Sequence, residues 1–245
     1  MAHIAVRTDL SLSSPTLVEG LPGVGLVGKI AADHLVDTLG MTHYADVHCE
    51  GIPRVAVYHG ESSEVKPPVR LYADEERDLL VLQSDVPVSP QSATDFASCI
   101  VGWLDEHDVT PLFLSGLPSE KDSGTPELYG VSTGDGERLL DEGGIVPPAE
   151  SGYVSGPTGA LLYEACQHGL AGVGLIVEAD PQFPDPEAAR VILKHGVGQL
   201  LDVEVNTDRL VEQAEEIRDA RERLAQRMQQ AADESTQAQP LRMFQ

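Results

Sequence analysis

A glycine-rich stretch near the start of the chain has the residue types and spacing that could bind a nucleotide. Gly23, Gly25 and Gly28 satisfy GxGxxG, whose glycines let the backbone approach a dinucleotide pyrophosphate at the start of a helix. The same stretch also reads as GxxxxGK, ending at Lys29, which is the beginning of a triphosphate-binding loop. The next residue is Ile30, which lacks the hydroxyl that such loops use to hold Mg²⁺. Triphosphate binding by this route is therefore not expected.

Two residues just before these glycines also oppose dinucleotide binding. Glu19 places a carboxylate at the end of an apolar run, where a phosphate would arrive, and Pro22 removes one backbone donor. The structural alternative is a turn, from Glu19 and Gly20 to Lys29, that packs a helix tightly on its strand. A site for another anion stays open. Lys29 is then either the anion contact or the ion-pair partner of a neighbouring acid.

Further polar residues follow the turn. Asp33, His34 and Asp37 share one predicted helix and could act as acid and base, although a solvated helix face also carries acids. Four potential metal ligands come next: His43, His48, Cys49 and His59. Their spacing matches no recognised metal site, and the sequence contains neither a GxSxG elbow nor an HExxH pair. We therefore predict no catalytic residue, no metal and no cofactor.

The elements that must position these residues alternate between strands and helices. Apolar and β-branched runs predict strands at 16–18, 55–58, 69–72, 79–82, 112–114 and 173–177. Helical periodicity predicts helices at 23–39, 90–105, 137–140, 158–168 and 186–200. This alternation predicts an α/β fold with a central mixed or mostly parallel sheet flanked by helices.

Two segments resemble a known family. The first is EGLPGVGLVGKIAADHLVDTLG at residues 19–40, and the second is GPTGALL at 156–162 followed by GVGLIVE at 172–178. They are similar to the proteasome assembly chaperone family, in which an E-G-x-P-x-x-G-x-x-G turn opens a long helix. The resemblance covers roughly residues 15–205. It implies a nucleoside-phosphorylase-like α/β domain that is usually homo-oligomeric and has no demonstrated general catalysis.

The charge of the chain limits its partners. Its 245 residues are 41% hydrophobic, enough for one large domain or a domain with an appendage, and carry a net charge of −24. A field of that sign repels phosphate backbones and anionic lipid, so nucleic-acid and membrane partners are not expected. The acids are dispersed and only four of 16 basic residues are lysines, which indicates an extreme halophile; an acidic interaction surface is the alternative.

Cysteine usage and hydropathy bear on the compartment. Cys49, Cys99 and Cys166 are odd in number and widely spaced, so we expect small buried thiols rather than a disulfide framework. No apolar run approaches the roughly 18 residues of a membrane helix. A cytoplasmic protein is expected.

The composition changes after residue 201, which suggests a domain at 1–205 and a C-terminal extension at 206–245. A long helix is expected there, with a coiled-coil-like seam made by Leu210, Ala214, Ile217, Leu224 and Met228. This helix either packs on its own domain or pairs with a copy of itself in a homo-oligomer. Residues 232–240 read as a flexible spacer.

The sequence ends in Met243, Phe244 and Gln245, a hydrophobic, an aromatic and a third residue. This resembles the motif by which proteasome activators and assembly chaperones dock between proteasome α-subunits, although tyrosine is the usual aromatic. Carboxylate capture with an aromatic anchor is the physical mode; the alternative is that the tail folds back on its own surface. We expect a homo-oligomeric assembly chaperone or activator. The competing hypothesis is an enzyme or ligand-binding protein that uses the turn at residues 23–29.

Overall fold

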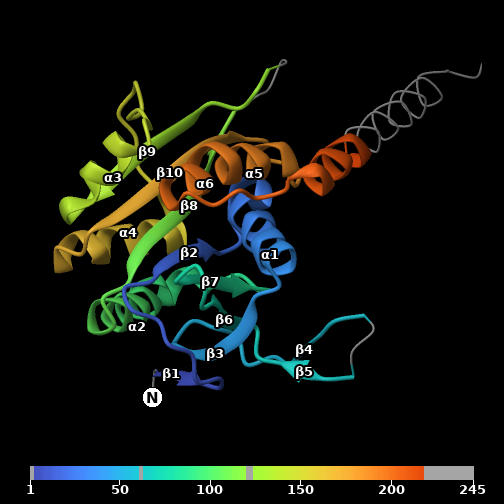
Figure 1. Cartoon of the computed structure of the whole chain (residues 1–245), viewed down its shortest axis with the longest axis vertical. Helices are drawn as coiled ribbons and strands as arrows, with labels where there is room; N and C mark the ends of the chain where they lie inside the picture. The colour runs from blue at the N-terminus through green and yellow to red at the C-terminus, as the bar shows by residue number, and fades with distance from the viewer. Residues whose placement is uncertain (1–2, 61–62, 120–123, 218–245) are drawn as a thin grey trace, which may run out of the picture.

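An eight-stranded mixed sheet runs through the centre of the protein (Figure 1). The computed structural model describes residues 3–60, 63–119 and 124–217. The strands of the sheet, in spatial order, are β1 (His3–Val6), β3 (Thr42–His48), β6 (Val69–Asp74), β7 (Leu79–Ser84), β2 (Thr16–Gly20), β8 (Thr110–Pro118), β10 (Gly172–Ala179) and β9 (Leu128–Thr133). Strands β7, β2, β8 and β10 are parallel to one another, and the strands outside them pair antiparallel. The predicted mixed sheet is therefore confirmed.

Helices cover both faces of this sheet. The α-helices are α1 (Val27–Leu39), α2 (Ala93–Glu106), α3 (Glu137–Glu142), α4 (Gly156–His168), α5 (Pro186–Ile192) and α6 (Gly198–Leu201). Short 3-10 turns are η1 (Val24–Leu26), η2 (Pro90–Ser92) and η3 (Gly134–Gly136), and a π-helical stretch, η4 (Leu193–Val197), joins α5 to α6. A further helix spans 208–217 within the described chain.

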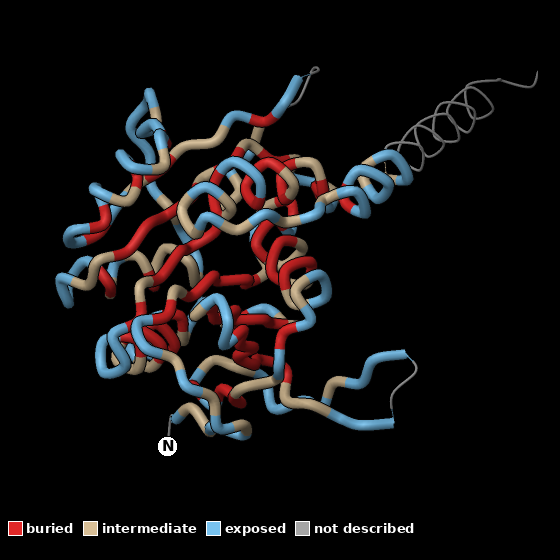
Figure 2. Tube along the Cα trace, viewed as in Figure 1, coloured by how far each residue is buried: buried red, intermediate tan, exposed pale blue. Residues whose placement is uncertain are grey.

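Two hydrophobic cores lie on opposite faces of the sheet. One contains buried side chains of α1 and α5, and the other contains those of α2 and α4. Strand β7 shows why both are needed: Leu79 and Val81 belong to the first core, while Leu80 and Leu82 belong to the second. Successive strand residues point to opposite faces, so a stretch packed between two apolar layers, as Leu79–Leu82 is, has apolar side chains at consecutive positions. Figure 2 shows the buried chain concentrated along these inner surfaces.

The helices begin and end close to the predicted positions, with local differences. The helix expected at 23–39 starts as η1 and becomes α-helical only at Val27, because Gly25 and Leu26 have φ values of 62° and 51°. The helix expected at 186–200 includes the π-helical stretch η4. Only Val57–Tyr58 of the strand expected at 55–58 forms β-structure.

Two segments extend from the body of the sheet. Strands β4 (Val57–Tyr58) and β5 (Val65–Lys66) form an antiparallel hairpin that projects outward (Figure 1). The helix at 208–217 begins against α1 and points away from the domain. Among the described residues, no helix is both long and apolar enough to cross a bilayer.

Candidate functional site at the glycine turn

The glycines between β2 and α1 allow the helix to approach the sheet closely. A Cβ atom on Gly20 would lie 2.1 Å from the Cβ of Ala32, and one on Gly28 would lie 3.1 Å from the carbonyl oxygen of Leu21. Real Cβ atoms do not approach other atoms as closely as the first distance. These two glycines therefore have a packing role, as the structural alternative in the sequence requires.

Gly25 has a second constraint, because its φ of 62° lies in the left-handed region. A Cβ there would lie 2.9 Å from the Cβ of Ala179 and 3.2 Å from that of Asp185. The carbonyl of Gly25 also accepts a hydrogen bond of 2.8 Å from the backbone N–H of Asp185. A Cβ on Gly23, by contrast, would have no other atom within 4 Å. The turn at Gly25 therefore packs tightly against the end of β10 and the residue before α5, and a backbone hydrogen bond holds it there.

Glu19 is fully buried and joins three parts of the fold. Its carboxylate accepts hydrogen bonds from the backbone N–H groups of Leu21 (2.8 Å) and Leu114 (3.1 Å). The hydroxyl of Thr158, in the first turn of α4, donates to the same carboxylate at 3.3 and 3.4 Å. The structure therefore brings together the two motifs that the sequence analysis singled out. Burial raises the pKa of Glu19 to about 7, and the three hydrogen bonds oppose that rise.

Lys29 points toward acids. Its ammonium lies 2.6 Å from Asp33 and 3.1 Å from Asp85, the residue that follows β7. Arg70, whose side chain is fully buried, donates to Asp85 at 2.6 Å and to Gln83 at 2.6 Å. Lys29 is therefore an ion-pair partner of neighbouring acids, which is the alternative to an anion contact at the turn.

The proposed acid–base residues of α1 have separate surroundings. Asp33 accepts from Lys29 and from the amide of Gln83. The ring of His34 is buried, and its Nε2 lies 2.6 Å from the carbonyl oxygen of Asn206. Asp37 faces Arg209 at 3.9 Å. These contacts tie α1 to the start of the C-terminal segment, and they do not form a shared acid–base pair.

The four potential metal ligands are dispersed. His43 lies 2.9 Å from Asp46 and stacks on Tyr72, while His48 stacks on His3. His59 is on the projecting hairpin, 3.7 Å from Asp85. Within the described ranges, no group of three or more His, Cys, Asp or Glu side chains is arranged to hold a metal ion.

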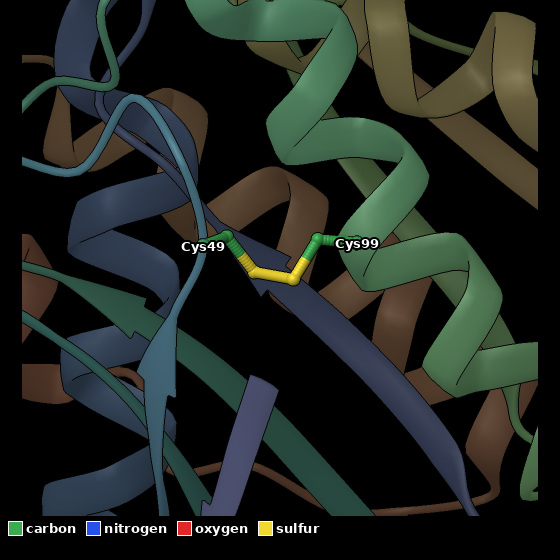
Figure 3. The surroundings of a disulfide bond; sticks show 2 residues. All are labelled: Cys49 and Cys99. Carbon is green, nitrogen blue, oxygen red and sulfur yellow. A yellow bond between two sulfur atoms is a disulfide. The ribbon is translucent and has the colours of Figure 1, made fainter. Parts of the chain in front are cut away.

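The prediction that the cysteines are all free thiols was wrong. Cys49, just after β3, forms a disulfide with Cys99 of α2, as Figure 3 shows, and only Cys166 is free and exposed. The two half-cystines are 50 residues apart in sequence, and nothing in their spacing indicates a pair. They meet because the loop after β3 crosses the face of the sheet that α2 covers. The argument from reduced thiols to a cytosolic compartment loses its basis.

The predicted C-terminal site is only partly within the described chain. Leu210 is 1% exposed and packs into the domain's own core beside α1, and Ala214 and Ile217 are half-buried. The remaining seam residues, Leu224 and Met228, and the tail residues Met243, Phe244 and Gln245 lie outside the described residues.

Sequence reasoning missed Arg70, Gln83 and Asp85, and it included Thr158 only as part of the GPTGALL motif, with no contact to Glu19 expected. One signal existed: Asp85 directly follows β7, which begins with four apolar residues and ends in Gln83 and Ser84, and the carboxyl ends of parallel strands are where α/β folds collect polar groups. Arg70 gave no such signal, because it lies inside β6 between apolar neighbours.

Solved structures share this architecture. PbaA of Pyrococcus furiosus, an archaeal homolog of proteasome-assembly chaperone, matches with a TM-score of 0.77 and 26% identity, covering 94% of this chain and 99% of that one. PbaB of the same organism, an archaeal proteasome activator, has the same fold, with a TM-score of 0.75 and 23% identity over 91% of this chain and 98% of that one.

Sequence comparison agrees with the fold. An uncharacterised protein of Methanocaldococcus jannaschii is 26% identical over 237 residues, which cover 96% of this chain and 95% of that protein. The PAC2 family model matches residues 17–225, a span that includes both the glycine turn and the segment around Thr158. The resemblance noted in the sequence is confirmed: the chain belongs to the PAC2 family.

Proposed function

We propose that this protein is a homo-oligomeric proteasome assembly chaperone or activator that docks its C-terminal tail on the proteasome α-ring. The observation that carries the proposal is the match to PbaA, which extends over nearly the whole of both chains. The tail sequence adds a chemical reason: Phe244 supplies an aromatic anchor, and Gln245 carries the carboxylate.

The contacts of the glycine turn support a binding protein rather than an enzyme. The carboxylate of Glu19 accepts three hydrogen bonds from its own fold, and Lys29 is paired with Asp33 and Asp85. Both side chains thereby have structural partners. Neither is left to bind a nucleotide phosphate.

Exposed apolar side chains support self-association. Val55, Tyr58 and Val65 on and beside the β4–β5 hairpin are 47%, 77% and 62% exposed. Contact with a second copy of the chain would remove these apolar side chains from water, and exposed apolar groups of this kind often mark such interfaces. Several copies would present several tails, and a weak anchor gains avidity when more than one tail binds the same ring.

The test is surface-plasmon binding of the full chain to cognate α-rings in high salt. Deleting Met243–Gln245, or Phe244→Ala alone, is expected to abolish binding and leave the oligomer intact. Phe244→Tyr should retain it. Leu241→Ala is the matched control, because it removes an apolar side chain from the same segment outside the three-residue motif. Equal binding by the truncated and intact proteins would refute tail docking.

A further inference from the structure

A polar cleft opens beside α1, at the carboxyl end of β7. Its volume is about 560 Å³, within the range of small-molecule sites. Helix α1 forms one wall with Lys29 and Asp33, and the β4–β5 hairpin forms another with His59 and Lys66. In Figure 1 the hairpin and α1 both lie toward the right of the view. Open α/β sheets bind ligands outside the carboxyl ends of their strands, which is where this cleft lies.

The charges at the base of the cleft compensate one another. Arg70 and Lys29 both contact Asp85, and together they hold the pKa of that carboxyl below its usual value against the effect of burial. Asp33 is paired with Lys29 and accepts from Gln83. A third carboxylate, Asp37, also lines the cleft and faces Arg209 at 3.9 Å, so each of the three carboxylates lies close to a cation. This base offers little to attract a metal ion or an organic cation.

Three further donors line the cleft: Lys66, His59 and Tyr72. Within the described part of the chain, the ammonium of Lys66 has no hydrogen-bond or ion-pair partner. His59 is half exposed and only 3.7 Å from Asp85. The hydroxyl of Tyr72 accepts a hydrogen bond from Nε of Arg70 at 3.3 Å, which leaves its own proton to donate. A half-buried lysine without a partner is unusual in a chain that has four lysines and a net charge of −24.

We propose that this cleft binds a small organic anion through a carboxylate or phosphate group held by Lys66, His59 and Tyr72. An anion supplies the negative counter-charge that Lys66 lacks, and its oxygens accept the hydrogen bonds that these three side chains can donate. A neutral ligand would leave Lys66 uncompensated, and a cation would be repelled by it. This function is additional to tail docking and does not depend on it.

The site also ties the hairpin to the body. His59 and Lys66 belong to the hairpin segment, whereas Tyr72 belongs to the central sheet. An anion that bridges them would hold a small two-stranded element that is marginally stable alone. Ligand binding should therefore slow amide hydrogen exchange in residues 55–60 and 63–66, an effect that can be measured independently of affinity.

The test is isothermal titration of the full chain with pyrophosphate and, separately, with citrate, in molar KCl. The high salt screens the repulsion between the ligand and the acidic protein. We expect at least one of the two anions to bind and to protect the hairpin from amide hydrogen exchange. Binding of pyrophosphate would indicate that the cleft recognises phosphate groups, and binding of citrate that it recognises carboxylates. Lys66→Ala should weaken binding by about tenfold or more, the effect of losing a charge-assisted hydrogen bond.

Lys194→Ala is the matched control, because Lys194 is exposed and does not line the cleft. It should bind as the original protein does. If neither anion binds at millimolar concentration, or if Lys66→Ala and Lys194→Ala bind equally well, the cleft is not an anion site. Neither result would affect tail docking, which is measured on α-rings.

Discussion

At the scale of single residues, Glu19 is the most unusual side chain in the protein. A fully buried carboxylate with three hydrogen-bond donors holds the turn, β8 and α4 together. Its pKa of about 7 lies above the ordinary value of 4.5. The folded state therefore binds a proton more tightly than the unfolded state does, and this difference stabilises the fold fully below about pH 4.5.

The first prediction follows from this difference. As pH rises from about 4.5 to about 7, the contribution of Glu19 to the free energy of unfolding should fall by roughly 3 kcal/mol. Urea denaturation at a series of pH values measures it. Glu19→Gln should remove that pH dependence and destabilise the protein by about 1–3 kcal/mol, because an amide N–H₂ would face a buried donor. Glu106→Gln, at an exposed site on α2, should keep the dependence.

The second prediction separates packing glycines from ligand-binding ones. Gly25→Val should destabilise the fold by about 2 kcal/mol or more without any ligand present, since its φ is positive and Ala179 and Asp185 fill the space. Gly23→Val should cost little, because its backbone is extended and its surroundings are open. Thermal denaturation of both variants decides between the interpretations. If Gly25→Val is as stable as the original protein, the packing account is wrong.

At the scale of elements, the sequence predicted what local patterns determine. Continuous apolar runs gave the central strands, and helical periodicity gave α1, α2 and α4. The contacts between elements could not be predicted from the sequence. Arg70 meets Gln83 because the register of β6 on β7 pairs these two residues, and that register depends on the intervening turn and not on either strand alone.

The disulfide gives the third prediction, at the same scale. The Cys49–Cys99 disulfide closes a long loop that contains the segment after β3, the β4–β5 hairpin, β6 and β7. Replacing both cysteines with serine should lower the free energy of unfolding by about 2–4 kcal/mol through the entropy of the unfolded chain. Cys166→Ser is the control, because this exposed thiol is not bonded, and should change stability by less than about 0.5 kcal/mol. Chemical denaturation with and without reductant measures both. Equal stability of the oxidised and reduced proteins would contradict it.

At the scale of the whole molecule, the charge of −24 dominates behaviour in solution. Each copy added to an oligomer increases repulsion, which salt screens over about 3 Å at 1 M. The fourth prediction is that the protein forms oligomers in molar KCl and dissociates or unfolds on dilution into low salt. Light scattering and circular dichroism measure the two effects. A monomer that is equally stable in both solutions would argue against self-association and against adaptation to high salt.

The family and the fold class were also predictable at this scale, since two short motifs and the order of the elements are properties of the sequence. Whether the C-terminal tail binds a partner was not predictable, because such binding depends on a second protein that the chain does not contain. Leu210 illustrates the limit. Its helical spacing fits an intermolecular seam equally well, yet the side chain lies in the domain's own core.

The bond between Glu19 and Thr158 joins residues 139 positions apart, and it bears on how the protein is made. Strand β2 lies at the centre of the sheet, paired with β7 and β8, so the N-terminal segment leaves the ribosome long before its neighbours exist. Until α4 is synthesised, the carboxylate has no hydroxyl to bind, and both edges of β2 stay unpaired until β7 and β8 have been made. Such non-local pairing slows folding and prolongs the exposure of aggregation-prone strands. The carboxylate of Glu19 therefore gains its full set of donors only after translation has passed α4.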